Sequence, residues 1–211
     1  MTIEAVLWDY GGVFTPSPFA AAQIYARAQG ADPDEMVRIV FGPYDTDTDH
    51  AWHRLERGEL SFVDALRLIS ADAATAGVRF DSGELFSTMA GDDVDRSVVI
   101  DAVRAVRARG IHTAIVTNNI REYGDVWRAR LAIDELFDLV IDSCEEGVRK
   151  PDPAIFRTAL ERLEVADPAR AMFLDDFEGN VLAARALGMQ AILVGPDPRP
   201  ALAELAARLE G

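Results

Sequence analysis

The sequence predicts an α/β fold, a doubly wound parallel sheet with a small α-helical cap domain. Three observations predict it: five short runs of apolar and β-branched residues recur along the chain, helical periodicity separates most of them, and one long interval near the N-terminus contains helices without a strand. Nearly continuous apolar runs of this length are typical of strands that helices cover on both faces, as in parallel sheets. The length of 211 residues suits one core domain with an insertion.

The elements of the core are predicted from hydrophobic periodicity and from the loop residues that bound each run. The predicted strands cover residues 5–10, 112–119, 138–143, 171–176 and 191–195. The predicted core helices cover residues 97–110, 121–133, 152–165, 179–189 and 199–211. Pro151 and Pro153 lie near the start of one helix, and Gly110 and Gly188 lie near the ends of two others, as expected at helix boundaries.

The interval from residue 16 to residue 95 interrupts this alternation of strands and helices. Its amphipathic stretches at residues 19–30, 32–42, 50–59 and 61–77 are helical in pattern, and we find no convincing strand among them. We therefore expect a core domain made of residues 1–15 and 96–211, and a helical cap domain made of residues 16–95.

Composition and charge exclude several classes of partner. The chain has 36 acidic and 21 basic residues, a net charge of -15, which would repel a phosphate backbone. No apolar run approaches the roughly 20 residues that span a bilayer. The single cysteine, Cys144, cannot form an internal disulfide, and the N-terminus does not look like a signal peptide. We expect a cytoplasmic monomer or homodimer that binds neither nucleic acid nor membrane.

Polar side chains follow four of the predicted elements at the same edge of the sheet. They are Asp9 after the first strand, Thr117, Asn118 and Asn119 after the second, Lys150 a short loop after the third, and Asp175 and Asp176 after the fourth. The carboxyl ends of the strands in a doubly wound sheet line one crevice, where ligands bind. We therefore expect these side chains to form one site.

The chemistry of this set points to Mg2+ and to phosphate. Three carboxylates without a histidine suit Mg2+ better than zinc, and a cation also relieves their mutual repulsion. A lysine and a hydroxyl opposite the metal favour an anionic ligand, most simply a phosphate. Two glycines, Gly11 and Gly12, follow shortly after Asp9 and let backbone amides approach that anion. Asp9 could then attack phosphorus as a carboxylate nucleophile.

Four segments occur in the order "LWDYGGV", "IVTNN", "VRKPDPAIF" and "FLDDFEGNVLAARALGM", with the helical interval between the first two. This ordered set resembles the motifs of the haloacid dehalogenase-like hydrolase superfamily, most of whose members are Mg2+-dependent phosphatases. The resemblance implies that Asp9 is the nucleophile and a metal ligand, and that the backbone carbonyl of Gly11 is another ligand. It implies that Asp176 is the direct acidic ligand, with Asp175 as a ligand or as support behind it.

The same resemblance assigns the phosphate site. Thr117 and the neighbouring Asn118 amide resemble the phosphate-binding motif, and Lys150 resembles the lysine that balances charge between nucleophile and phosphoryl group. Gly11 and Gly12 would complete the phosphate-binding site with their backbone amides. The implied ligands are Mg2+ and a small phosphorylated molecule.

One residue departs from the family pattern. Phosphatases of this family commonly carry a second aspartate two residues after the nucleophile as the acid and base, and this chain has Gly11 there. Loss of a positioned acid and base typically costs about 10² to 10⁴ in rate. Some branches with such glycines resemble working sugar-phosphate phosphatases. Substitutes from the cap would come from Asp47, Asp49, His50, His53 and Glu56, although the two histidines could equally pack or cap a helix.

We therefore predict a Mg2+-dependent phosphomonoester hydrolase that acts on a small phosphorylated metabolite, such as a sugar phosphate, through an aspartyl-phosphate on Asp9. One alternative is a 2-haloacid dehalogenase, in which the aspartate attacks carbon without a metal. The pair Asp175 and Asp176 argues against it. A second alternative is a non-catalytic phosphate-binding or regulatory protein, because Gly11 replaces the acid and base.

Overall fold

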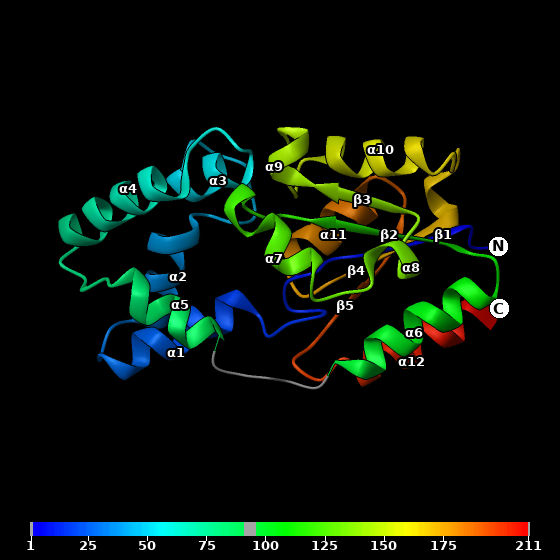
Figure 1. Ribbon diagram of the computed structural model, residues 1–211, viewed down its shortest axis with the longest axis horizontal. Coiled ribbons are helices and arrows are strands. Elements are labelled where there is room, and N and C mark those ends of the chain that lie inside the picture. The colour runs from blue at the N-terminus through cyan, green and yellow to red at the C-terminus, as the bar shows by residue number, and fades with distance from the viewer. Residues whose placement is uncertain (1, 91–95, 211) are drawn as a thin grey trace.

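The computed structural model describes residues 2–90 and 96–210, and it confirms the predicted α/β fold (Figure 1). A parallel sheet of five strands has the order β3-β2-β1-β4-β5. The strands are β1 (Ala5–Trp8), β2 (His112–Thr117), β3 (Leu139–Asp142), β4 (Ala171–Asp175) and β5 (Gln190–Leu193). All five predicted strands are present, and each is shorter than its predicted range, so the polar residues expected at strand ends lie at or just beyond the last paired residue.

The strand order places a topological switch point between β1 and β4. The chain moves outward from β1 through β2 to β3, then returns to the other side of β1 for β4 and β5. Trp8, the last residue of β1, is paired in parallel with Ile115 of β2 and with Leu174 of β4. The crevice at a switch point is where doubly wound sheets bind ligands. The loops after β1 and β4 therefore meet at this crevice.

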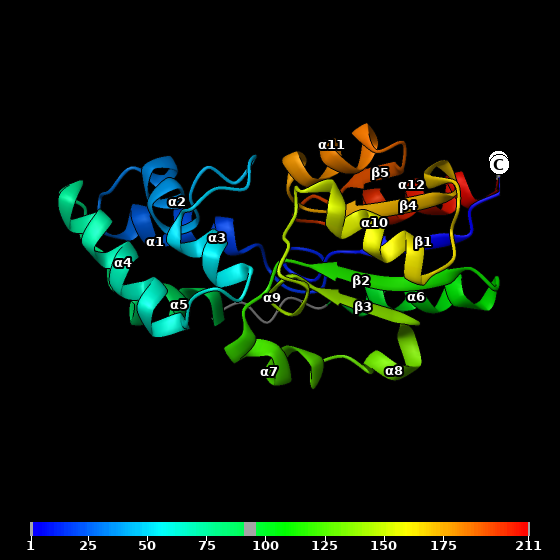
Figure 2. The same ribbon diagram turned by 90° about the horizontal axis from the view of Figure 1, so that it is seen from above.

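Helices cover both faces of the sheet, which explains why its strands are apolar throughout. The longer core helices are α6 (Ser97–Ala108), α10 (Pro153–Arg162), α11 (Glu178–Ala186) and α12 (Arg199–Glu210). Val6 and Trp8 pack on the side of α6 and α12, whereas Ala5 and Leu7 pack on the side of α10 and α11. Figure 1 shows α10 above the sheet and α6 and α12 below it, and Figure 2 shows the same layers from above.

The predicted helix at residues 121–133 is wrong. The segment forms instead a single 3-10 turn, η1 (Arg121–Tyr123), followed by the short helices α7 (Gly124–Arg128) and α8 (Ile133–Leu136). Gly124 lowers helix propensity inside the predicted helix. Trp127 is fully buried against Tyr10, with ring centroids 4.9 Å apart, and the chain then turns so that Leu136 also enters the core. Tertiary burial of these apolar residues therefore overrides the helical pattern.

Two helices were not predicted. The one-turn helix α9 (Ser143–Glu146) is too short to show a periodic pattern, and the Asp142 carboxylate caps it by accepting from the Cys144 N–H. The other is α5 (Ser82–Ala90), which follows Asp81 in the helical interval. A further 3-10 turn, η2 (Pro168–Arg170), leads into β4.

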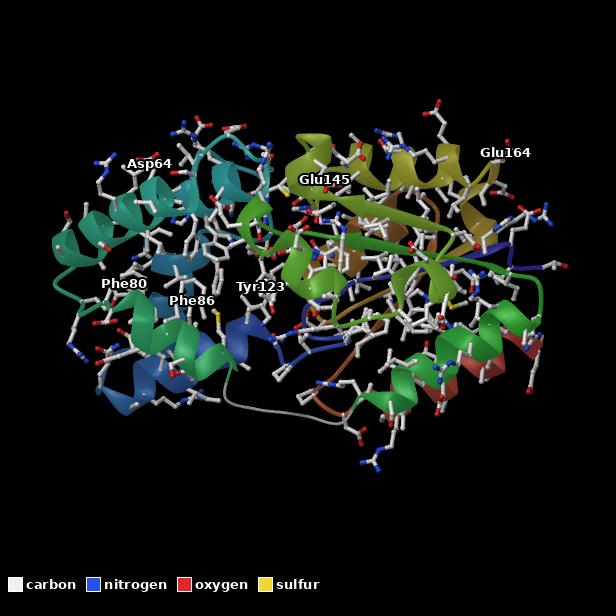
Figure 3. The ribbon with its side chains drawn as sticks, viewed as in Figure 1. Asp64, Phe80, Phe86, Tyr123, Glu145 and Glu164 are labelled. Atoms are coloured by element: carbon white, nitrogen blue, oxygen red, sulfur yellow. The ribbon has the colours of Figure 1, made fainter. Side chains whose placement is uncertain are left out.

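The N-terminal interval folds as helices around a hydrophobic cluster of its own, beside the sheet (Figures 1 and 2). Its helices are α1 (Pro18–Ala28), α2 (Pro33–Phe41), α3 (Ala51–Glu56), α4 (Phe62–Thr75) and α5. Figure 3 shows Phe80 and Phe86 among the side chains of this group, whereas Asp64, Glu145 and Glu164 are exposed. We call residues 18–90 the helical cap. The predicted boundary after residue 95 falls on residues 91–95, outside the described residues, and the division into two domains remains a proposal.

Among the described residues, no helix combines the length and the apolar character needed to cross a lipid bilayer.

Candidate active site

A buried ammonium between two carboxylates forms the centre of the site. Asp9 follows β1, and its backbone N–H donates to the Leu174 carbonyl of β4 at 2.8 Å. The Lys150 Nζ lies 2.7 Å from Asp9 Oδ1 and 2.7 Å from Asp175 Oδ2. Burial alone would lower the pKa of Lys150, but Asp175 and Asp9 outweigh it and raise that pKa. Lys150 is the only lysine in the chain, and its side chain is almost completely buried.

Asp175 is held by three donors. Its Oδ2 accepts from the Lys150 ammonium and from Asn180 Nδ2 at 3.0 Å, and its Oδ1 accepts from the Phe177 N–H at 2.7 Å. These bonds fix the carboxylate in one orientation. The next residue, Asp176, is half-buried, and Ser17, which directly precedes the cap, opposes the rise of its pKa.

The residues present fit a divalent cation. One carboxylate oxygen from each of Asp9, Asp175 and Asp176 lies within 4.8 Å of the others. Burial, opposed by Lys150, raises the pKa of Asp9 to about 8, and burial together with Asp175 raises the pKa of Asp176 to about 7. Asp9 would be mostly protonated and Asp176 partly protonated at neutral pH unless a cation favoured their charged forms. An all-oxygen set of this kind suits Mg2+.

The two glycines after Asp9 differ in whether the structure requires glycine at their position. Gly12 has a φ of +73°, and a Cβ there would lie 2.0 Å from Asp176 Cγ. Both the backbone angle and the close approach of Asp176 therefore call for glycine. At Gly11, a Cβ would meet only Pro18, at 3.8 Å, which is an ordinary van der Waals distance. A Cβ fits at position 11, so the space around it does not explain why glycine stands where the family pattern has aspartate.

The residues after β2 reach Lys150 through its backbone. Thr117 is buried at the end of β2. The side chain of Asn118 accepts from the Lys150 N–H at 2.8 Å and donates to the Lys150 carbonyl at 2.9 Å. This clamp occupies the Asn118 side-chain amide, so the predicted phosphate contact of Asn118 would fall to its backbone N–H. The backbone N–H of Asn119 donates to Ser143 Oγ at 3.0 Å.

The two cap histidines are engaged with α3. His50 caps this helix, because its Nδ1 accepts from the Trp52 N–H at 3.2 Å. His53 is fully buried, and its Nδ1 accepts from the Thr48 N–H at 3.0 Å. Burial and the nearby Arg149 lower the pKa of His53 to about 3. The lowered pKa favours neutral His53 at physiological pH, so an imidazolium at this position is not expected to supply the missing acid.

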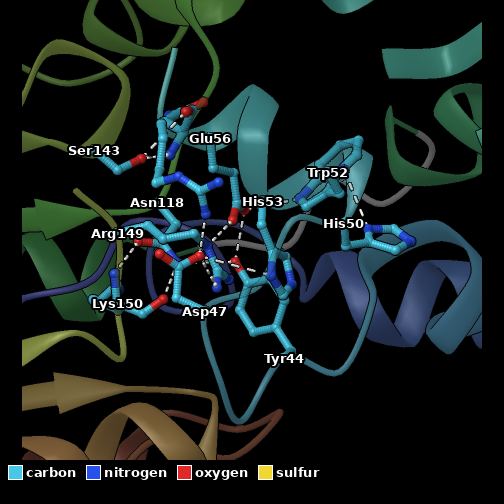
Figure 4. Close-up of polar contacts among 12 residues, drawn as sticks. Tyr44, Asp47, His50, Trp52, His53, Glu56, Asn118, Ser143, Arg149 and Lys150 are labelled. Atoms are coloured by element: carbon cyan, nitrogen blue, oxygen red, sulfur yellow. Dashed lines mark hydrogen bonds and ion pairs between the residues drawn. The ribbon is translucent and has the colours of Figure 1, made fainter. Parts of the chain in front are cut away.

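Sequence reasoning missed a buried polar network between the cap and the core (Figure 4). Glu56, which the sequence offered as a substitute acid, accepts from Tyr44 Oη at 2.7 Å, from Trp52 Nε1 at 2.8 Å and from Arg149 Nε at 2.7 Å. The Arg149 guanidinium also lies 4.3 Å from the centre of the Tyr44 ring. The only sequence signal was the place of Arg149 beside Lys150, since Glu56 lies 93 residues away.

Aromatic side chains join the cap to the core beside Asp176. The ring of Phe177 lies 5.2 Å from that of Phe19 and 5.1 Å from that of Tyr44, centre to centre. Phe19 belongs to α1, so the first cap helix lies against the loop that carries Asp176. Nothing in the sequence pattern paired these rings.

Comparison with known proteins gives a consistent result. Residues 3–188 match the family described as haloacid dehalogenase-like hydrolase. The chain is 33% identical to acyl-CoA dehydrogenase family member 10 of Mus musculus over 98% of its own length and 19% of that protein. It is 31% identical to bifunctional epoxide hydrolase 2 of Mus musculus, over 92% of the chain and 37% of that protein. The chain thus spans well under half the length of these relatives.

Other similar proteins match over most of both chains. A sesquiterpene phosphatase of Aspergillus oryzae is 25% identical, over 89% of this chain and 88% of that protein. A predicted HAD-like family hydrolase of Porphyromonas gingivalis has a TM-score of 0.66 and 20% identity, over 98% of each chain. The HAD family enzyme bt-2542 of Bacteroides thetaiotaomicron, solved with magnesium and inorganic phosphate, has a TM-score of 0.60 and 17% identity, over 92% and 96%.

The adjacent glycines provide a matched pair of substitutions. We expect Gly12→Ala to lower the free energy of unfolding by at least about 1–2 kcal/mol, because an L-residue is strained at this φ and its Cβ overlaps Asp176. Gly11→Ala should change it by less than about 0.5 kcal/mol. Denaturant titration of both variants measures the difference, and equal stability of the two would contradict the geometry.

The raised carboxyl pKa values predict how stability depends on pH without metal. Asp9 and Asp176 ordinarily titrate near 3.8 and titrate at about 8 and about 7 in the folded chain. The folded state therefore binds more protons, and the free energy of unfolding falls as the pH rises from about 4 to 8. Added Mg2+ should restore stability, most strongly at high pH. Melting temperatures with EDTA or MgCl2 test this, and Asp176→Asn should flatten both effects while the exposed Asp101→Asn should not.

Proposed function

We propose that this chain, which belongs to the haloacid dehalogenase-like hydrolases, is a Mg2+-dependent phosphatase that uses Asp9 as its nucleophile. The observation that carries the proposal is the buried Lys150 ammonium held 2.7 Å from both Asp9 and Asp175, beside a third carboxyl at Asp176. Such a site pairs positive charge for a phosphoryl group with carboxylates for a hard cation and for covalent attack. The proposed substrate is a small phosphomonoester, such as a sugar phosphate.

The proposed reaction has two steps. A carboxylate oxygen of Asp9 attacks phosphorus, the bond from phosphorus to the ester oxygen breaks, and the departing alkoxide takes a proton from solvent to become the alcohol. Water then attacks phosphorus of the aspartyl-phosphate and gives a proton to solvent, and the bond between phosphorus and the Asp9 oxygen breaks, which releases inorganic phosphate and restores the Asp9 carboxylate. Lys150 balances the negative charge of the phosphoryl group in both steps, while Thr117 and the backbone N–H of Asn118 bind its oxygens.

Mg2+ would be held by Asp9, Asp176 and the backbone carbonyl of Gly11, and would supply positive charge that favours the ionised form of Asp9. Asp175 already has three donors, so its proposed part is to orient Lys150 and to support the metal site from behind. The names of two similar proteins support this proposal: one is a sesquiterpene phosphatase, and the other was solved with magnesium and phosphate.

The alternatives receive less support. Attack on carbon in a haloacid needs no metal, and it gives no reason to gather three carboxyls at one point, where burial and the neighbouring carboxyls raise the pKa values of Asp9 and Asp176. A non-catalytic role would follow from Gly11 only if the leaving group always needed protonation. A good leaving group needs little protonation, so Gly11 restricts the range of esters that can be hydrolysed without abolishing hydrolysis.

The first test is hydrolysis of an aryl phosphate. We expect turnover that requires Mg2+ and that falls to background in Asp9→Asn, which keeps the shape of the side chain but removes the nucleophile. Because the aryl group leaves readily, the assay does not depend on an acid at position 11. Binding of inorganic phosphate without any turnover would favour the non-catalytic alternative, and turnover of a 2-haloacid instead would favour dehalogenation.

The missing acid at Gly11 gives a second, sharper test. We expect Gly11→Asp to raise kcat/KM for an alkyl phosphate by about 10²-fold or more, since the new carboxyl can protonate a poor leaving group. The gain for an aryl phosphate should be much smaller. Gly11→Ala adds the Cβ without the carboxyl and serves as the control. An equal effect of Gly11→Asp on both esters would show that leaving-group protonation does not limit this enzyme.

A further inference from the structure

We infer that Tyr44 and Glu56 of the helical cap are positioning residues for Lys150, and that docking of the cap places the ammonium between Asp9 and Asp175. The inference rests on the proposed function, because it gives Lys150 its role in the reaction. Neither cap residue needs to touch the substrate. Each acts through a core residue that controls the Lys150 backbone.

The first connection runs through Asn118. Its side chain binds both the N–H and the carbonyl of Lys150, at 2.8 and 2.9 Å, so its orientation fixes the peptide groups on either side of the lysine. The same Nδ2 also donates to Tyr44 Oη at 3.2 Å. The hydroxyl of Tyr44 can accept this bond because its own proton goes to Glu56 Oε1 at 2.7 Å.

The second connection runs through Arg149, which precedes Lys150 in the chain. Its guanidinium is fully buried, and among the described residues it contacts the cap at three points: Glu56 at 2.7 Å from Nε, Asp47 at 3.6 Å from Nη1, and the ring of Tyr44. Within the described chain, Nη1 and Nη2 have no hydrogen-bond partner. A buried charge this sparsely paired depends strongly on Glu56, since removing one partner leaves it uncompensated.

Together the two connections form a closed circuit (Figure 4). From the Lys150 backbone it passes to Asn118, Tyr44, Glu56 and Arg149, and the peptide bond returns it to Lys150. If the cap moved away, Arg149 would lose its ion pair and Asn118 would lose the bond that orients it. Small misplacements at a reacting centre are costly, so the ammonium should be in place only while the cap is docked.

The competing explanation is that these residues only hold the cap on the core. A second contact between cap and core separates the two explanations, because the Phe62 N–H donates to Glu122 Oε1 at 2.8 Å without touching the circuit. Glu122→Ala therefore weakens cap docking alone. Tyr44→Phe removes one hydroxyl from the circuit and keeps the ring that packs on Arg149 and Phe177.

The test uses the fact that Lys150 is the only lysine. Protein labelled with 15N-lysine gives one backbone amide signal and one side-chain ammonium signal, both from Lys150. In metal-free protein we expect both signals to shift in Tyr44→Phe, and more strongly in Glu56→Gln, but not in Glu122→Ala. Tyr44→Phe keeps the aromatic ring, so the loss of a ring current cannot account for a shift of the Lys150 signals.

Kinetics on an aryl phosphate complete the test. We expect kcat of Tyr44→Phe to fall about fivefold to tenfold with KM within about twofold, because the hydroxyl that orients Asn118 is lost. The unfolding midpoint should fall as well, since the bonds of this hydroxyl to Glu56 and Asn118 are both lost, so the comparison with Glu122→Ala decides the test. Unchanged Lys150 signals in Tyr44→Phe, or an equal loss of kcat in Glu122→Ala, would overturn the inference. Absence of turnover in the unmodified protein would instead defeat the proposed function, while the Lys150 signals would still report whether the cap positions this residue.

Discussion

The buried contact of the Lys150 ammonium with Asp9 and Asp175 is the interaction on which the rest of the site depends. A charge inside a protein is tolerated only when it is paired and hydrogen-bonded, so one ammonium and two carboxylates must reach the same point together. The carboxylates come from the ends of β1 and β4, which are neighbours only because the strand order reverses there. The topology of the sheet is thus a condition for burying this charge.

The cap adds a second buried charge beside the first. Arg149 and Glu56 pair across the boundary between cap and core, and Tyr44 links them to Asn118. Buried polar networks favour one arrangement of their parts, because any other leaves donors or charges without partners. The boundary is therefore held in register by hydrogen bonds as well as by the contact of Phe19 with Phe177.

The glycine pair after Asp9 shows two different reasons for one residue type. Gly12 is dictated by its backbone angle and by the approach of Asp176. Gly11 is dictated by neither, and its effect is chemical only under the proposed function, in which the site lacks an aspartate at this position to protonate the leaving group. Steric necessity and chemical restriction can therefore be separated at adjacent positions.

The sequence by itself determined the sheet, the helical interval, and the gathering of Asp9, Lys150 and Asp175, because strand ends converge in any doubly wound sheet whatever their details. It predicted one helix at residues 121–133, where burial of Trp127 instead breaks the helix. Only the tertiary structure decided that Glu56, a candidate acid from its local context, is bound by Arg149 from 93 residues away. Local sequence patterns predict whether a residue faces the core or the solvent within its own helix or strand. Its partners across the boundary between cap and core depend on how those two parts pack against each other, which no local pattern contains.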